Sequence, residues 1–195
     1  MQSFPFDESL VSKNRFHGLI QGKFVEQDGK ILLLTEFGTI KLWPRSGKRF
    51  YWTLSRARQQ FRDKPDAVIN VYGYPRANEA GIIHGLVMTN WFPANEHLRS
   101  DSKSLCRKFN PGQMFLCGRV KEIEANGIIR VRVKSQIPNV GLRWWDIYGT
   151  NVGQVIQHSK VLFMGWHESD GKLMFQPIKT VTPPGQKTYY APVKE

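Results

Sequence analysis

Residues 113–134 read QMFLCGRVKEIEANGIIRVRVK, and this stretch decides the fold. Asn126-Gly127 separates two runs of alternating character, and Asn-Gly is the strongest short-range signal for a β-hairpin. In the second run, apolar residues alternate with cations, and successive side chains of a strand point to opposite faces. The stretch therefore predicts a hairpin with an apolar face (Ile129, Val131, Val133) and a basic face: Arg119, Lys121, Arg130, Arg132 and Lys134.

The basic face has two interpretations. Residues on the same side of a strand lie roughly 6.5–7 Å apart, which is about the step between phosphates along an extended single nucleic-acid strand. A cation at every second position would then follow such a backbone. The simpler interpretation is a solvated outer face that happens to be basic.

The composition favours a folded protein with an anionic partner. The 195 residues are 41% hydrophobic and 12% aromatic, which is enough for a packed core. The net charge is +12, divided between residues 1–100 (14 basic minus 9 acidic, +5) and residues 101–195 (14 minus 7, +7). A surplus spread in this way favours nucleic acid first and an anionic membrane surface second.

No membrane span or secretory signal is visible, so we expect a cytoplasmic location or an equivalent organelle matrix. Two cysteines, Cys106 and Cys117, are too few for a disulfide framework or a paired zinc ligand set, and we expect both as reduced thiols. Cys117 beside Gly118 predicts a small buried side chain, not an activated thiolate.

Strand signals recur along the chain. Asp28-Gly29 predicts a second hairpin, and the spacing of apolar residues over Phe50–Arg62 predicts a short helix that ends before Pro65. Other expected strands are Thr39–Trp43, Ala67–Tyr74 and Ile82–Trp91. We therefore expect an N-terminal arm (1–14), a first β unit (15–92), a linker (93–112), a second β unit (113–181) and a C-terminal tail (182–195).

The two β units are similar to each other. Gly22 and Gly73 are 51 residues apart in the first unit, and Gly118 and Gly165 are 47 apart in the second. In both units these glycines lie in strand-like runs at the same places in the strand order. A repeated order of this kind predicts an internal duplication. The alternative is that two antiparallel units share only their turn chemistry.

Each unit resembles the OB-fold superfamily, a five-stranded Greek-key barrel with a connector between its third and fourth strands. The resemblance lies in the order of elements and in a glycine within the first strand, where a barrel strand bends sharply. It implies a mainly all-β protein of two tandem OB-like barrels, the first with a connector helix. The second connector, Asp146 to Ser159, contains two glycines and is a poor helix. A pair of SH3-like barrels is the nearest structural alternative.

Patterns for catalysis and cofactors are weak. The five histidines are scattered without metal-ligand spacing, and no phosphate-binding loop or nucleophile elbow is present. We therefore expect neither an enzyme, nor a cofactor, nor a metal. A hydrolase with an unrecognised site is the least favoured alternative.

Aromatic residues interleaved with cations point to nucleic acid. Lys41 and Trp43 share one face of an expected strand, and so do Arg143 and Trp145 in the second unit. Single-strand binders combine cations that follow the backbone with flat rings that stack on bases. The competing interpretation is that these rings pack in the barrels. The predicted nucleic-acid-binding residues are Lys41, Trp43, Arg45, Arg49, Arg119, Lys121, Arg130, Arg132, Lys134, Arg143 and Trp145.

The favoured function is the binding of single-stranded DNA or RNA with little sequence preference. The alternative is a non-enzymatic protein-interaction module that docks an acidic partner or a large assembly. A fold of this class serves either role, so it does not choose between them.

Overall fold

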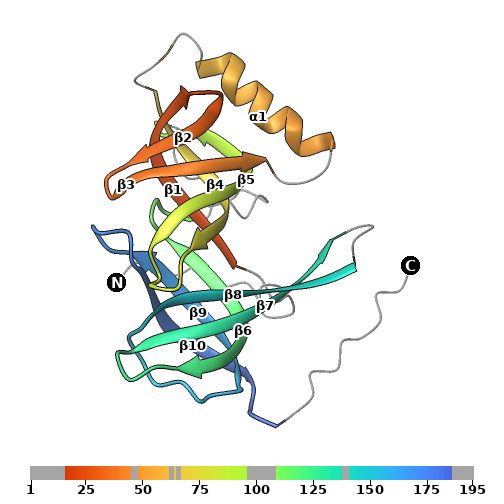
Figure 1. Cartoon of the computed structure of the whole chain (residues 1–195), viewed down its shortest axis with the longest axis vertical. Coiled ribbons are helices and arrows are strands. Elements are labelled where there is room, and N and C mark those ends of the chain that lie inside the picture. The colour runs from red at the N-terminus through yellow and green to blue at the C-terminus, as the bar shows by residue number, and fades with distance from the viewer. Residues whose placement is uncertain are drawn as a thin grey trace.

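A computed structural model describes residues 16–44, 48–61, 64, 67–95, 109–137 and 141–185. The first half contains β1 (Phe16–Gln27), β2 (Lys30–Thr35), β3 (Gly38–Pro44), α1 (Lys48–Phe61), β4 (Val68–Ala77) and β5 (Ile83–Pro93). The second half contains β6 (Met114–Ile123), β7 (Ile128–Ile137), β8 (Gly141–Asn151), β9 (Lys160–His167) and β10 (Leu173–Thr182). Figure 1 shows the two halves one above the other. The prediction of a mainly β protein with one short helix in its first half is confirmed.

Each half closes into a ring of five strands. In the first ring β1 pairs with β2, β2 with β3, β3 with β5, β5 with β4 and β4 with β1. The second ring repeats this order from β6 to β10. Among the described strands, only the pairs β3–β5 and β8–β10 are parallel. The order is that of an OB-like barrel, as the resemblance implies.

A glycine in the first strand of each barrel permits closure. A Cβ added at Gly22 of β1 would collide with the carbonyl oxygen of Leu34 in β2. At Gly118 of β6 it would lie 2.8 Å from the carbonyl oxygen of Arg132 in β7. Both strands therefore approach their neighbours more closely than any residue with a side chain would allow.

Both predicted hairpins are confirmed. Asp28 and Gly29 join β1 to β2 with positive φ angles of 51° and 69°, the backbone of a two-residue turn that favours Asp-Gly. Between β6 and β7 only Gly127 has a positive φ, of 84°. There the Asn126 side-chain oxygen accepts a hydrogen bond from the backbone N–H of Ile128 at 2.9 Å.

The connectors between the third and fourth strands differ between the barrels. Helix α1 packs Phe61 against Phe24 and Trp91, with ring centroids 5.8 and 5.0 Å apart, so it covers one end of the first barrel. In the second barrel, residues 152–159 form a loop without a helix, as the glycines predict. This loop begins later than expected, because β8 continues to Asn151.

The barrels are joined by a continuous sheet. β1 and β6 pair antiparallel, with Gly18 opposite Met114. Beyond this pair, the N–H of Leu19 donates to the carbonyl of Gln113 at 3.0 Å. Gly22 and Gly118 are 96 positions apart, and so are Gly18 and Met114. The pair therefore maps onto itself when the repeats are exchanged, which places it on a local pseudo-twofold axis.

A second contact obeys the same symmetry. The N–H of Ile83 donates to the carbonyl of Gly171 at 3.0 Å, and the N–H of Leu173 donates to the carbonyl of Gly81 at 2.9 Å. Ile83 and Leu173 are 90 positions apart, and so are Gly81 and Gly171. Exchange of the two repeats therefore turns one hydrogen bond into the other. The internal similarity predicted from the glycine spacing is thus a twofold arrangement of two barrels.

The end of the expected linker packs onto both barrels. Phe109 is fully buried, and its ring lies 5.5 Å from Phe115 of β6 and 5.9 Å from Tyr72 of β4. A separate and larger apolar core extends through both barrels. The domain limits at 15–92, 93–112 and 113–181 stay a prediction. Nowhere in the described ranges does a helix have the length and apolar character needed to span a bilayer.

Candidate nucleic-acid interface

Strand β7 alternates between buried apolar residues and outward-facing arginines, as its sequence predicts. Ile129, Val131 and Val133 are buried in the second barrel. Arg130 and Arg132 point outward, with 31% and 36% of their side chains exposed. The apolar face thus enters the core, and the cations lie on the outside of the wall.

Strand β6 contributes differently from the expectation of a regular row. Arg119 lies directly opposite Arg132, but the register shifts between Val120 and Glu122. Lys121 occupies the irregular position, and Glu122 takes the place opposite Arg130. A bulge of this kind inserts one residue and changes which side chain faces the neighbouring strand.

Strand β8 adds the carboxylate of Asp146, which the sequence patterns did not predict as part of the site. The Arg132 guanidinium donates to both Asp146 oxygens, from Nε at 2.7 Å and from Nη2 at 2.8 Å. Arg130 Nη1 lies 3.6 Å from Asp146 Oδ2, and its Nη2 lies 2.8 Å from Glu122 Oε2. The hydrogen bonds from Arg132 hold the pKa of Asp146 below its usual value, with Arg130 and Lys121 adding to the effect.

These side chains and two rings of β8 form one surface, named here the β6–β8 outer face. It consists of Arg119, Lys121, Glu122, Arg130, Arg132, Trp144, Asp146 and Tyr148. Four cations and two carboxylates give it a net charge of +2. Arg119 also donates from Nη1 to the carbonyl of His158 at 2.7 Å. The carboxylates of Glu122 and Asp146 therefore balance part of the predicted positive charge within the face.

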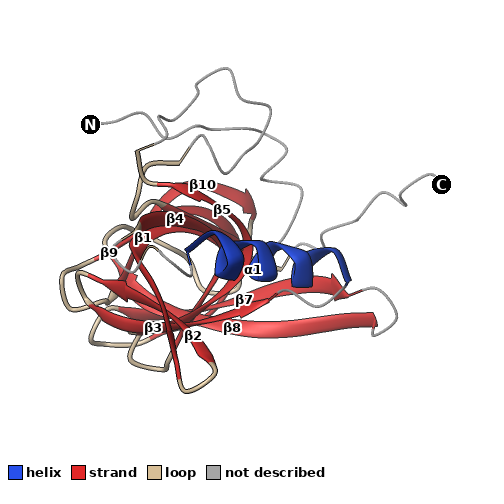
Figure 2. Cartoon of the chain, turned by 90° about the horizontal axis from the view of Figure 1, so that it is seen from above, coloured by secondary structure: helices blue, strands red, loops and turns tan. Residues whose placement is uncertain are grey.

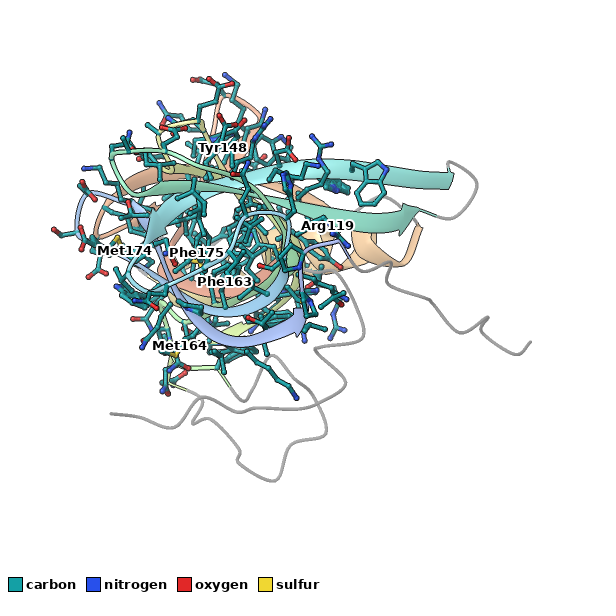
Figure 3. All side chains as sticks on the ribbon, turned by 90° about the horizontal axis from the view of Figure 1, so that it is seen from below. Arg119, Tyr148, Phe163, Met164, Met174 and Phe175 are labelled. Atoms are coloured by element: carbon teal, nitrogen blue, oxygen red, sulfur yellow. The ribbon has the colours of Figure 1, made fainter. Side chains whose placement is uncertain are left out.

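The exposed tryptophan of this surface is Trp144, not the predicted Trp145. Trp144 is 55% exposed, whereas Ile147 is buried, so Trp144, Asp146 and Tyr148 share the outward side of β8. Trp145 pairs with the buried Val133 and packs against the core. Figure 3 shows Phe163 and Phe175 inside the barrel and Tyr148 toward the outside.

Trp145 also helps to join the barrels. The guanidinium carbon of Arg76, from β4, lies 4.7 Å from the centroid of the Trp145 ring. Burial lowers the pKa of Arg76. The favourable position of this cation over an indole face gives Trp145 a structural role.

The β7–β8 hairpin continues beyond the second barrel as a two-stranded ribbon (Figures 1 and 2). Among the described strands, residues 133–137 of β7 pair only with β8. Lys134 lies on the ribbon opposite Trp144, and Arg143 lies opposite Ser135. The side chains of Lys134 and Arg143 are outside the described part of the chain.

The first barrel places its predicted pair as expected. Leu42 is buried, so Lys41 and Trp43 point outward from β3. Lys41 Nζ lies 5.3 Å from the centroid of the Trp43 ring, and this ring covers Gly85 of β5, where a Cβ would collide with it. Arg45 lies outside the described residues, and Arg49 lies in α1 with its side chain outside them.

The two aromatic–basic motifs do not occupy corresponding places. Gly22 abuts Leu34 and Gly118 abuts Arg132, so these two neighbours correspond. Leu34 pairs with Thr39 of β3, and Arg132 pairs with Asp146 of β8. Equivalent residues of β3 and β8 are therefore 107 positions apart in the sequence. The counterpart of Trp43 is therefore Thr150, and that of Trp145 is Gly38. The first-barrel counterparts of Arg130 and Arg132 are Leu32 and Leu34, whereas the counterpart of Arg119 is Lys23. The pair of arginines on β7 therefore belongs to the second barrel alone.

The hairpins nevertheless lie on the same side of the molecule. In Figure 2, β2, β3, β7 and β8 lie along one side, and β4, β5 and β10 lie along the other.

Two further observations concern metal binding and thiol chemistry. Within the described ranges, no group of three or more His, Cys, Asp and Glu residues is arranged to hold a metal ion. Cys117 is fully buried, and desolvation raises the pKa of its thiol to about 11, which confirms the prediction of an unactivated cysteine. Cys106 lies outside the described part. No protein-family model matches this chain, and no curated protein matches it in sequence.

Proposed function

We propose that the chain binds single-stranded nucleic acid, DNA or RNA, with the β6–β8 outer face as its main contact. The observation that supports this most is the placement of Arg119, Arg130 and Arg132 beside two outward rings, Tyr148 and Trp144. Arginine offers a planar fork of donors that matches phosphate oxygens. Rings stack on any base, because every base has a π face.

The ion pairs within the face are compatible with this role. Arg130 and Arg132 keep about a third of their side chains exposed, so a phosphate can approach both from solvent. Asp146 and Glu122 hold the guanidinium groups in place before the ligand arrives, which reduces the entropy lost on binding. They also lower the net charge, and we expect moderate affinity that depends strongly on salt.

The first barrel supplies a secondary contact in this proposal. Lys41 and Trp43 lie on β3, and this strand lies on the same side of the molecule as β7 and β8 (Figure 2). A strand long enough to reach both barrels should therefore bind more tightly than one that covers the second barrel alone. Phosphate contacts and stacking carry little sequence information, so we expect little sequence preference. The proposal includes no cofactor and no catalytic step.

One observation favours protein docking instead. The first-barrel counterparts of Arg130 and Arg132 are Leu32 and Leu34, and Leu34 is 40% exposed. Together with Trp43 they place three large apolar side chains beside Lys23 and Lys41 on the outer face of the first barrel, a mixed surface that suits a protein partner. Under this alternative the purified protein carries a specific protein and no nucleic acid.

The test is fluorescence anisotropy with a labelled 12-nucleotide single strand at several salt concentrations. The wild-type chain should bind at low salt and weaken along a straight line of log K against log salt. The variant R119Q/R130Q/R132Q should lower the slope of this line by about 2, at roughly 0.7 for each phosphate contact.

The matched control is K64Q/K172Q/K179Q, which removes the same charge from exposed lysines outside the β6–β8 outer face. It should keep the wild-type slope. No binding at low salt would refute the proposal, and equal effects of the two triple variants would show that only overall charge matters.

A further inference from the structure

Three outward side chains of β8 alternate between ring and carboxylate. Tyr148, Asp146 and Trp144 occupy every second position, so neighbours are roughly 6.5–7 Å apart and the two rings about 13 Å apart. This separation corresponds to about two steps of an extended single strand. Bases stacked on Tyr148 and Trp144 would leave one base between them, next to Asp146.

Asp146 presents this middle base with a fixed acceptor. Both its oxygens receive hydrogen bonds from Arg132, which fixes the orientation of the carboxylate. The side chain is 21% exposed, so it is reached from solvent. A carboxylate has about four lone-pair sites, and Arg132 uses two of them. The same hydrogen bonds lower the pKa of Asp146, so at neutral pH the group accepts and does not donate.

We infer that Asp146 gives this surface a preference for a base that donates a hydrogen bond at its middle position, cytosine over thymine or uracil. The 4-amino group of cytosine donates to a carboxylate, whereas thymine presents a carbonyl oxygen at the same place. An acceptor that meets another acceptor is repelled and leaves both without a partner. This inference rests on the proposed function and adds a base preference to its otherwise nonspecific contacts.

Glu122 provides the matched comparison. It is also a carboxylate paired with an arginine of β7, Arg130, at 2.8 Å. It lies on β6, and its same-side neighbours on that strand are not rings. The inference therefore assigns the base preference to Asp146 and none to Glu122, although loss of either negative charge should strengthen phosphate binding to a similar degree.

The experiment compares labelled (dC)12 and (dT)12 by anisotropy at pH 8, where cytosine is unprotonated. The wild-type chain should bind (dC)12 about tenfold more tightly than (dT)12, because one hydrogen bond to a charged group contributes about this factor. In D146N the ratio should fall to near one, and in E122Q it should stay near ten. Circular dichroism and the melting temperature check that both variants are folded.

A ligand-side control needs no variant. An oligonucleotide of N4,N4-dimethylcytosine lacks the donor but stays a pyrimidine of similar shape, so the wild-type chain should bind it no more tightly than (dT)12. Equal binding of (dC)12 and (dT)12 would overturn the inference and leave the proposed function intact. Binding of neither would refute both. A preference that survives in D146N or with the dimethylated strand would also overturn the inference.

Discussion

Trp144 and Trp145 are sequence neighbours on opposite faces of β8, and their alanine variants should separate binding from folding. Trp144 points outward and is 55% exposed. Trp145 packs against the core beneath Arg76. We expect Trp144→Ala to weaken nucleic-acid binding and leave the fold intact, and Trp145→Ala to destabilise the fold.

The magnitudes follow from the two environments. Loss of one stacking ring costs about 1–3 kcal/mol of binding free energy, so Trp144→Ala should raise Kd by roughly 5- to 150-fold. A fully buried tryptophan cut to alanine costs about 3–5 kcal/mol. Trp145 is only partly buried, but it also loses the Arg76 contact, so we expect about 2–3 kcal/mol. For a chain of this size that lowers Tm by roughly 4–12 °C.

Anisotropy of a labelled single strand measures the change in Kd, and thermal melts followed by circular dichroism measure the change in Tm. The Trp144→Ala variant should melt within about 2 °C of the wild-type chain, as for most exposed substitutions. The reasoning is refuted if Trp144→Ala binds as tightly as the wild-type chain, or if the folded Trp145→Ala variant loses binding while its Tm is unchanged.

Three further substitutions test the fold and its electrostatics. Gly118→Ala should lower the free energy of unfolding by about 1–3 kcal/mol, because the new methyl group would lie 2.6 Å from Val131 Cγ1; urea titration measures this loss, and a wild-type midpoint would contradict it. Phe109→Ala should cost about 3–5 kcal/mol by the same titration, since the ring is fully buried. The lowered pKa of Asp146 means that its ionised form stabilises the native state above the unfolded-state pKa of about 4, and that this stabilisation is lost as pH falls through the folded-state pKa. The wild-type chain should therefore lose more stability than Asp146→Asn between pH 5 and pH 2, as measured by melts across this range.

Local signals in the sequence predicted much of the architecture. Asp28-Gly29 and Asn126-Gly127 specify the hairpin turns through the backbone they favour. Gly22 and Gly118 mark the strands that approach their neighbours too closely for a side chain. These features depend on a few adjacent residues, so periodicity and turn chemistry are sufficient to find them.

The details of the site depend on register between distant strands, which sequence periodicity does not fix. The bulge at Lys121 brings Glu122 opposite Arg130, and it has no local signature in the sequence. Asp146 meets Arg132 only because β7 and β8 align in one register. A shift of one residue would exchange the roles of Trp144 and Trp145. For this reason the sequence predicted an outward-facing Trp145, whereas the structure places Trp144 on the outward side and packs Trp145 against the core.

The pseudo-twofold joint between the barrels also has a consequence for self-association. Gly18 and Met114 hold equivalent places in the two repeats, and the N–H groups of Ile83 and Leu173 make equivalent bonds across the same axis. A chain that opens at this joint exposes a surface whose complement is present on every other opened copy. Two such chains can exchange barrels and restore each bond of the joint between molecules. At high concentration, mild heating should therefore produce domain-swapped dimers before it produces disordered aggregates.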